Sequence, residues 1–446
     1  MSRPFSDPAI GRLADLAART GAVMRAVPSS TGIGAPGAQP APANLARSPI
    51  STQPQAAPSA VPFPRASALA TMKDKSFTLA AAGTQLVTLQ TNAFLENLIL
   101  DVSLVTSANV AAVAFVADAP WNLLSQLQLT DPSGESIISP ITGYHLYLLN
   151  KYLPDVECSF DPKADPHFSA VTGTGANGGS ISFRLVVPIE IRRRNALGAV
   201  NNSAANQRYR LKLNAIASFA SLYTTAPTTE AANFSVQITQ QYWTSPPSVI
   251  RTKTGTVATQ QTPQGLGSVG FIRYETHNEV TGGGTPQFQL TNVGDYIESL
   301  IFILRDATTK RDVYAPVKSS TNANWPATFF WWVNDFQVQS LSAYGPAGRT
   351  SARGAGGVWP REMARFYRYT NKTYEAATGL DNGVYTFTNM FGLFTRAANY
   401  ATSNQFLPTD ATTKLQQRGS TWGAGSKRLE VLVRIIRPVS GAALFS

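Results

Sequence analysis

Residues 181–213 read ISFRLVVPIEIRRRNALGAVNNSAANQRYRLKL, and this stretch decides how the rest of the chain is interpreted. Apolar residues alternate with other residues from Ile181 to Ile191, which predicts a β-strand with one buried face. Pro188 removes a backbone donor, so we expect this strand at the edge of a sheet or at a bend. A second alternating run, from Arg208 to Ala217, predicts another strand. The stretch therefore indicates a β-rich fold.

A basic cluster lies between these two strands and is formed by Arg192, Arg193 and Arg194. A short Leu-Gly element and a polar loop of Asn and Ser residues follow it. The cluster either contacts an acidic surface of a neighbouring subunit or is a solvated group of charges. The sequence leaves both interpretations open.

The order of these features resembles a known family. A strand that ends in an apolar–Pro–apolar step, a basic break, a short Leu-Gly element and a new strand is similar to the major capsid proteins of tailless, membrane-containing phages, the tectiviruses. That family belongs to the double jelly-roll lineage, which includes the adenovirus hexon. The resemblance implies an all-β chain of two tandem jelly-roll sandwiches, with short helices in the loops and an N-terminal arm.

Candidate strands recur along the chain in two series of the same order. The first series is Gln85–Thr91, Leu98–Val105, Asn122–Thr130, Ile181–Ile191, Arg208–Ala217 and Asn233–Trp243. The second series is Gln287–Thr291, Ser299–Arg305, Phe329–Gln339, Gly383–Phe391 and Arg428–Arg437. A helix is predicted after the third strand of each series, over Pro140–Tyr152 and Pro360–Tyr369. The repeated order predicts a duplicated domain.

Composition divides the chain into five predicted segments. The N-terminal segment has the spacing of a basic amphipathic helix, and a Pro- and Ala-rich segment that cannot form its own core follows it. The expected order is a helix at 1–26, an arm at 27–72, a first jelly roll at 73–245, a polar linker at 246–270 and a second jelly roll at 271–446.

Positive charge dominates the chain, with 37 lysine and arginine residues against 26 aspartate and glutamate residues and a formal net charge of +11. Such a balance favours anionic partners. In the N-terminal helix, arginines are expected to face lipid headgroups of an internal membrane or packaged DNA, and these are Arg3, Arg12, Arg19 and Arg25. The alternatives are a helix packed on its own protein and a helix packed on a neighbouring subunit.

A single cysteine, Cys158, excludes an intrachain disulfide framework. No stretch of the sequence approaches the roughly 18 apolar residues of a membrane span, and the N-terminus has no apolar core of a signal peptide. We therefore expect synthesis in the cytoplasm of a host, followed by incorporation into a virion.

Catalytic signatures are missing from the sequence. His145 has helical spacing among apolar residues and is expected to be a packing residue. Residues 173–178 match a dinucleotide-binding pattern, but they lead into a strand instead of a helix. Asp161, Asp165 and His167 lack a fixed ligand spacing, so a solvated acidic loop is favoured over a cation site. We expect no enzymatic activity, catalytic residue, cofactor, metal ion or small-molecule substrate.

Four consecutive aromatic residues occupy positions 329–332. They cannot all face one side of a strand, so part of the run must be buried in a core or an interface. Trp331 and Trp332 are therefore expected at subunit contacts, together with the basic cluster. Stacking on a carbohydrate or a base is the alternative.

The favoured interpretation is a major capsid protein that forms trimeric, pseudo-hexagonal capsomers and tiles an icosahedral shell. Its expected partners are further copies of itself, penton or vertex proteins, minor capsid proteins, and membrane lipids or DNA at the arm. The alternative is a viral receptor-binding or vertex protein, or a carbohydrate-binding β-sandwich module.

Overall fold

The computed structural model describes much of the unit that runs from Pro58 to Ser446. The described residues are 60–107, 112–153, 162–172, 174, 177–191, 196–253, 255–263, 265–279, 287–291, 295–306, 328–333, 336–342, 384–388, 407–408, 412–419 and 427–437. Several sequence predictions lie outside them: the N-terminal helix with Arg3, Arg12, Arg19 and Arg25, the basic cluster Arg192, Arg193 and Arg194, Asp161, Cys158, and the helix over Pro360–Tyr369.

The first sandwich consists of two sheets with strand orders β1-β12-β3-β8 and β2-β10-β5-β6. Its strands are β1 Leu69–Ala80, β2 Thr84–Thr88, β3 Phe94–Leu104, β5 Leu124–Thr130, β6 Ser136–Ile141, β8 Ile181–Pro188, β10 Arg210–Ala215 and β12 Asn233–Trp243. Short elements complete it: α2 Phe63–Ala66, β4 Ala114–Phe115, η1 Trp121–Leu123, α3 Gly143–Tyr152, η2 Pro162–Ala164, β7 Ser169–Ala170, β9 Val200–Asn201, η4 Phe219–Leu222 and β11 Tyr223–Thr225.

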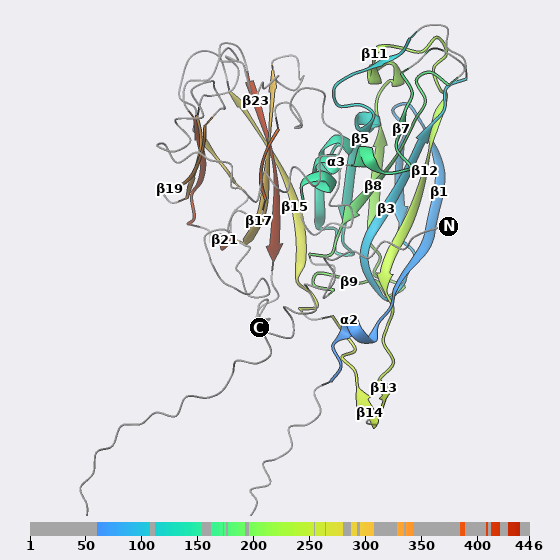
Figure 1. Ribbon diagram of the computed structural model, residues 1–446, viewed down its shortest axis with the longest axis vertical. Coiled ribbons are helices and arrows are strands. Elements are labelled where there is room, and N and C mark those ends of the chain that lie inside the picture. The colour runs from blue at the N-terminus through green and yellow to red at the C-terminus, as the bar shows by residue number, and fades with distance from the viewer. Residues whose placement is uncertain are drawn as a thin grey trace, which may run out of the picture. The chain divides into compact units, whose positions relative to one another are not determined.

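The second sandwich has sheets with strand orders β15-β23-β17-β20 and β16-β22-β18-β19. Its strands are β15 Val269–Glu279, β16 Gln287–Gln289, β17 Tyr296–Asp306, β18 Thr328–Val333, β19 Phe336–Ser342, β20 Val384–Thr388, β21 Leu407–Pro408, β22 Leu415–Gly419 and β23 Lys427–Arg437. Figure 1 shows these strands beside the first sandwich, with α3 between the two groups.

The two sandwiches repeat one topology strand for strand. In chain order, β1, β2, β3, β5, β6, β8, β10 and β12 correspond to β15, β16, β17, β18, β19, β20, β22 and β23. Even the accessory pairing recurs, because β9 pairs with the start of β3 as β21 pairs with the start of β17. The predicted tandem jelly roll is confirmed, and the strands expected at Leu98–Val105 and Ser299–Arg305 occupy equivalent central places.

Alternating apolar residues form the core between the sheets, as the period of two requires. Leu98 and Leu100 of β3 are fully buried, and they pair with Val187 and Leu185 of β8. β8 ends at Pro188, and among the described residues only the two-residue strand β7 pairs with its far side. The edge position expected from this proline agrees with that arrangement.

The first described elements lie before the predicted boundary at residue 73. β1 starts at Leu69, and Phe63 of the preceding helix α2 is fully buried. The Phe63 ring lies 5.1 Å from Phe94 and 6.3 Å from Trp243, so one aromatic residue anchors the end of a segment that was expected to be an arm.

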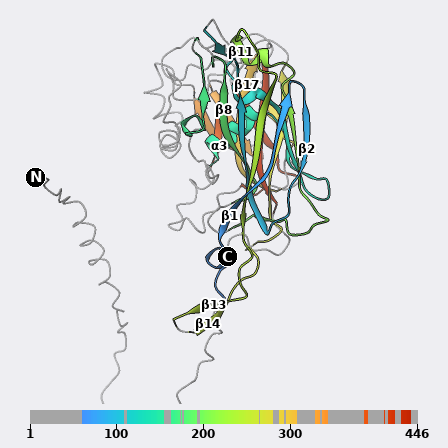
Figure 2. The same ribbon diagram turned by 90° about the vertical axis from the view of Figure 1, so that its right-hand side faces the viewer.

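The predicted linker at 246–270 is also partly structured. It contains a hairpin of β13 Val249–Thr252 and β14 Gly255–Ala258, which projects beyond the sandwich strands in both views (Figures 1 and 2). β15 then begins at Val269. A polar composition does not exclude a hairpin, because cross-strand backbone bonds form with any side chains.

Two further boundaries differ from the sequence prediction. The strand expected over Phe329–Gln339 is a tight hairpin of β18 and β19. The helix α3 begins at Gly143, not at Pro140, because the Thr142 side chain caps it by accepting a bond from the His145 N–H. A Cβ at position 143 would lie 2.1 Å from the Trp121 carbonyl oxygen, so only glycine fits there.

Candidate functional site at the junction of the two sandwiches

The two sandwiches meet where β6 of the first lies beside β15 of the second. Ile138 and Ile272 form a parallel bridge, and through it one continuous sheet runs from β2 to β20. Both isoleucines are buried, at 0% and 1% exposure. This bridge carries backbone pairing from one sandwich into the other.

A buried ionic cluster forms the centre of the junction. Glu430 of β23 accepts from Arg305 Nε at 2.8 Å and lies 3.1 Å from His145 Nε2 of α3. Arg305 also donates through Nη1 to Asp118 of the first sandwich, at 2.7 Å. The cluster therefore joins β17 and β23 of the second sandwich to α3 and a loop of the first.

The tautomer of His145 follows from its second contact. Its Nδ1 accepts from the Thr142 backbone N–H at 3.3 Å, so Nε2 carries the proton that points at Glu430. Burial alone raises the pKa of the Glu430 carboxyl, but the hydrogen bonds from His145 and Arg305 and the positive charge of Arg305 outweigh it and lower that pKa to about 2. Glu430 is an anion at neutral pH.

A second buried pair crosses the same face of β23. Arg434 and Glu298 are 2.8 Å apart with side chains 2% and 1% exposed. Arg434 also donates through Nη2 to the Glu190 carbonyl oxygen of the first sandwich, at 2.8 Å. Buried ion pairs add little net stability because desolvation offsets their attraction, but removal of one partner is costly. Glu298 holds Arg434 in place within the second sandwich, and we infer that the Arg434 bond to the Glu190 carbonyl helps to fix the orientation of the sandwiches.

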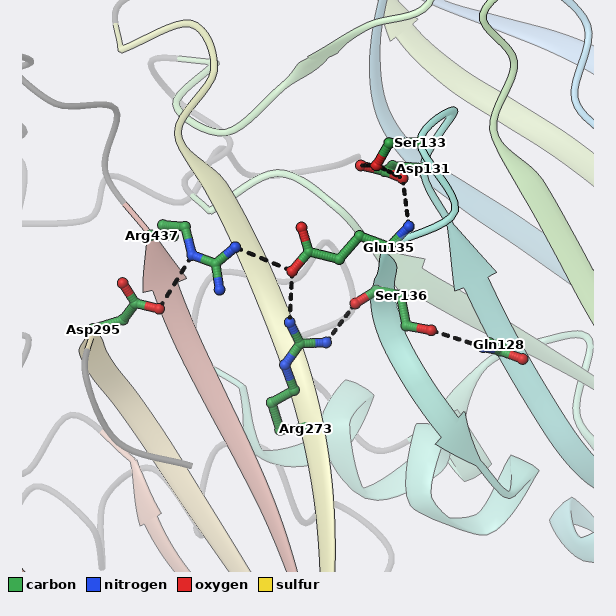
Figure 3. A network of polar contacts seen from close by, with 8 residues as sticks. All are labelled: Gln128, Asp131, Ser133, Glu135, Ser136, Arg273, Asp295 and Arg437. Atoms are coloured by element: carbon green, nitrogen blue, oxygen red, sulfur yellow. Dashed lines mark hydrogen bonds and ion pairs between the residues drawn. The ribbon is translucent and has the colours of Figure 1, made fainter. Parts of the chain in front are cut away.

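A third, partly exposed network closes the rim of the junction (Figure 3). Glu135 of the first sandwich lies 3.3 Å from Arg273 Nη2 and 3.0 Å from Arg437 Nη1. Both guanidinium groups are 4.5 Å from the centre of the Phe271 ring. Arg437 extends the network to Asp295 at 3.3 Å. The Phe271 ring and Glu135 thus hold two cations side by side.

The ion pairs and hydrogen bonds of this site link the two sandwiches. Within the described ranges no group of three or more His, Cys, Asp or Glu side chains could hold a metal ion. No helix of the described part is long and apolar enough to cross a membrane. His167 Nδ1 lies 2.8 Å from Asp165 Oδ1, but Asp161 lies outside the described residues.

The predicted subunit-contact residues are not brought together at this junction. Trp331 and Trp332 lie on β18, which pairs with β22 on one side and β19 on the other. Their backbone therefore has a central place in its sheet, while their side chains are outside the described part. The predicted roles of these tryptophans and of the basic cluster stay predictions.

Sequence reasoning missed the junction residues. His145 is buried as expected, but it also makes a hydrogen bond with Glu430, a residue far along the chain. One signal was present in the sequence: residues 94–100 read FLENLIL and residues 296–302 read YIESLIF. Glu96 and Glu298 of this repeat both occupy β-bulges, at register shifts in β3 and β17.

The comparisons with known proteins agree with this architecture. No protein-family model and no curated protein matches the chain. The major capsid protein of Sulfolobus turreted icosahedral virus matches with a TM-score of 0.54 and 12% identity, over 84% of this chain and 99% of that one. A chain of the atomic structure of that virus matches with a TM-score of 0.52 and 11% identity, over 82% and 90%.

A weaker match is the major capsid protein of bacteriophage PM2, with a TM-score of 0.41 and 9% identity over 84% of this chain and 100% of that one. At identities this low, the first two matches establish the fold: the chain is a double jelly roll of the kind found in these viral capsid proteins.

Proposed function

We propose that this chain is the major capsid protein of a tailless icosahedral virus. The observation that carries the proposal is the rigid junction between two topologically identical sandwiches. A block of two fixed lobes can generate a six-lobed ring from three copies, and such rings tile a shell. The two viral structures that share the fold support the same role.

The work of such a protein is geometric. Three copies would place six sandwiches around one axis, and each copy would contribute two adjacent lobes. The buried contacts that cross the junction are Glu430 with His145, Arg305 with Asp118 and Arg434 with the Glu190 carbonyl oxygen. They support this view, because a mobile joint could not give lobes of constant spacing. Self-association into capsomers and then into a shell is the proposed activity, and the virion is the proposed location.

The N-terminal arm has a separate proposed role. Arg3, Arg12, Arg19 and Arg25 would contact lipid headgroups or packaged DNA on the inner side of the shell, since guanidinium groups bind phosphate in a bidentate manner. Deletion of Met1–Ala57 tests this role and spares the buried anchor Phe63. The expected result is an intact trimer that no longer floats with anionic liposomes. Unchanged flotation would contradict the role of the arm.

The main experiment is the oligomeric state of the purified full chain and its abundance in particles. Size-exclusion chromatography with light scattering should give a stable trimer, and the chain should be the dominant protein of purified virions. A monomer that is a minor virion component would overturn the proposal and favour a vertex or receptor-binding protein.

A further inference from the structure

The two central sheets can be compared residue by residue because both carry a bulge at the same place. The bulges at Glu96 and Glu298 align β3 with β17, and the cross-strand register then aligns β12 with β23. By this alignment Gln237 of β12 corresponds to Glu430 of β23. The comparison shows where the interior of one sandwich differs from the interior of the other.

One such difference lies at Gln240 of β12. By the same alignment its counterpart is Val433, a core residue of the second sandwich, and both residues are 0% exposed. An amide in a core position needs hydrogen-bond partners, because an unsatisfied buried polar group costs free energy. Gln240 therefore marks a buried polar cluster that the second sandwich does not have at this position.

The carboxylate of Asp74 in β1 belongs to this cluster. The register of β1 against β12 shifts at Asp74, which is the extra residue of a β-bulge. Bulges can re-aim a side chain, and Asp74 is only 7% exposed although its neighbours Lys73 and Lys75 are both exposed. β15, the counterpart of β1, pairs with β23 without a register shift, so it has no residue equivalent to Asp74.

Hydrogen bonds within the cluster use all donors of its two fully buried amide groups. Gln240 Nε2 donates to Asp74 Oδ2 at 2.7 Å and to the Gln90 carbonyl oxygen at 3.0 Å. Asn202 Nδ2 donates to the same carbonyl oxygen at 2.8 Å and to Asn92 Oδ1 at 3.3 Å. An amide group has two N–H donors, so neither of these side chains has another to offer.

Two buried oxygen atoms of the cluster accept no hydrogen bond from the described residues, and these are Asp74 Oδ1 and Asn202 Oδ1. Both side chains bond to the backbone of Gln90, through its N–H at 3.2 Å and its carbonyl oxygen at 2.8 Å. The two oxygens are acceptors only, and the buried donors around them are already used. Whatever satisfies these oxygens therefore comes from outside the chain.

The charge of Asp74 favours a cation over a water molecule in this place. The described partners of its carboxylate are the Gln90 N–H and the Gln240 amide, and both are uncharged. A buried carboxylate is stable when it is paired with a cationic group or coordinates a metal ion. Water would satisfy the oxygen atoms, but it would not compensate the negative charge.

The second sandwich contains a related carboxylate that has a basic neighbour. Glu275 of β15 accepts from the Thr291 N–H at 3.2 and 3.1 Å, much as Asp74 accepts from a backbone N–H near the end of β2. Glu275 also lies 3.2 Å from His277 Nε2. The first sandwich thus has the carboxylate and its backbone contact without the basic side chain.

We propose that the first sandwich binds a calcium ion through Asp74 Oδ1 and Asn202 Oδ1. Carboxylate and amide oxygens are the ligands that hard cations prefer, and water completes the coordination of such ions. Ca²⁺ tolerates irregular geometry, whereas Mg²⁺ requires a near-ideal octahedron, and hydrogen bonds already fix both side chains. The ion stabilises β1, the strand through which the N-terminal arm enters the sandwich.

The test measures calcium binding and thermal stability of the full chain after treatment with a chelator. In isothermal titration calorimetry the wild type should bind one Ca²⁺ per chain at this site, and excess CaCl₂ should raise its melting temperature by about 2 °C. Asp74→Asn should abolish both effects, because it removes the charge. The matched control is Asp101→Asn, which removes a carboxylate of the same sheet that pairs with Arg184 and should respond to CaCl₂ as the wild type does.

Several outcomes would overturn the proposal, and each leaves the capsid function standing. A wild type that neither binds Ca²⁺ nor melts higher with it would show that water alone satisfies the cluster. An equal response of Asp74→Asn would place the ion elsewhere, and an equal shift with MgCl₂ would contradict a calcium site. Should Asp74→Asn fail to fold, Asn202→Ser decides the matter: we expect an affinity for Ca²⁺ that is about tenfold weaker, and an unchanged affinity would contradict the site.

Discussion

Two sheets of the molecule, β1-β12-β3-β8 and β15-β23-β17-β20, have the same topology. Their outward faces differ, because one is open and the other is covered within the chain. Leu100 and Phe302 hold the same central core position, and both are fully buried. On the outward face, Gln237 lines an open groove, whereas its counterpart Glu430 is locked between Arg305 and His145. The residues that face the core are thus alike in the two sandwiches, whereas the outward residues differ with the surroundings of each sheet.

This difference shows how a duplicated domain becomes a building block. Two identical lobes would have no reason to prefer their own chain over another copy. The covered face carries the buried pair of Arg305 and Glu430, whereas the open face carries hydroxyl groups and the partly exposed pair of Asp101 and Arg184. The two faces are therefore chemically distinct, which is a means of specificity between otherwise similar surfaces.

Core truncation should affect both sandwiches to a similar extent. Phe302→Ala is expected to lower the free energy of unfolding by about 3–5 kcal/mol, and Leu100→Ala by about 2–5 kcal/mol, because each leaves a cavity in a packed core. Since the sandwiches share a continuous sheet, both variants should shift one common unfolding transition in calorimetry. Two separate transitions, each sensitive to one variant, would show that the junction does not couple the lobes.

The outward counterparts should differ sharply from each other. Glu430→Ala strips the buried Arg305 of a partner and is expected to cost about 3–5 kcal/mol in denaturant unfolding. Gln237→Ala, at the corresponding position of the open groove, should change stability by less than about 0.5 kcal/mol in the unassembled monomer. Equal costs for the two variants would contradict the difference between the faces.

Acid should weaken the closed junction selectively. The pKa of Glu430 is lowered to about 2 in the folded protein, so its contribution is complete above the ordinary carboxyl pKa of about 4.5 and is lost as the pH falls toward 2. The shift corresponds to about 3 kcal/mol at most. The unfolding free energy should be measured from roughly pH 6 to roughly pH 3, where carboxyl groups take up protons. It should fall less steeply for Glu430→Gln than for the wild type. Identical slopes would exclude Glu430 as the titrating group.

The rim network should contribute least. Glu135 is 43% exposed, so Glu135→Gln is expected to cost less than about 1 kcal/mol. The loss should shrink further in high salt, where exposed charges are screened. Denaturation at low and high salt checks both points. A cost as large as that of Glu430→Ala would mean that the rim, and not the buried cluster, fixes the joint.

Alternation in the sequence predicted the strands that bury one clean face. The boundaries of β12 agree with the prediction at Asn233 and Trp243, and β8 starts at the expected Ile181. β1 and β15 were missed for physical reasons. The bulge at Asp74 breaks the alternation of β1, and β15 is paired on both sides and carries polar residues toward the junction.

The junction itself could not be predicted from one sequence. Its central contact joins residues 145 and 430, and no local spacing relates a helix to a strand that distant in the chain. The repeated FLENLIL and YIESLIF segments could have aligned the two halves, and that alignment would have placed Gln237 opposite Glu430. The alignment would not have shown that the first sandwich covers the outward face of the sheet β15-β23-β17-β20.

We propose that three copies of this chain make a ring of six sandwiches. Electron microscopy of the purified full chain tests it most directly, through class averages viewed along the symmetry axis. We predict a closed trimer with six lobes of similar size and a hexagonal outline, with the sheet β1-β12-β3-β8 of each copy turned toward its neighbour. A trimer whose first sandwiches stand apart from any neighbour, or a population of two-lobed monomers, would contradict it.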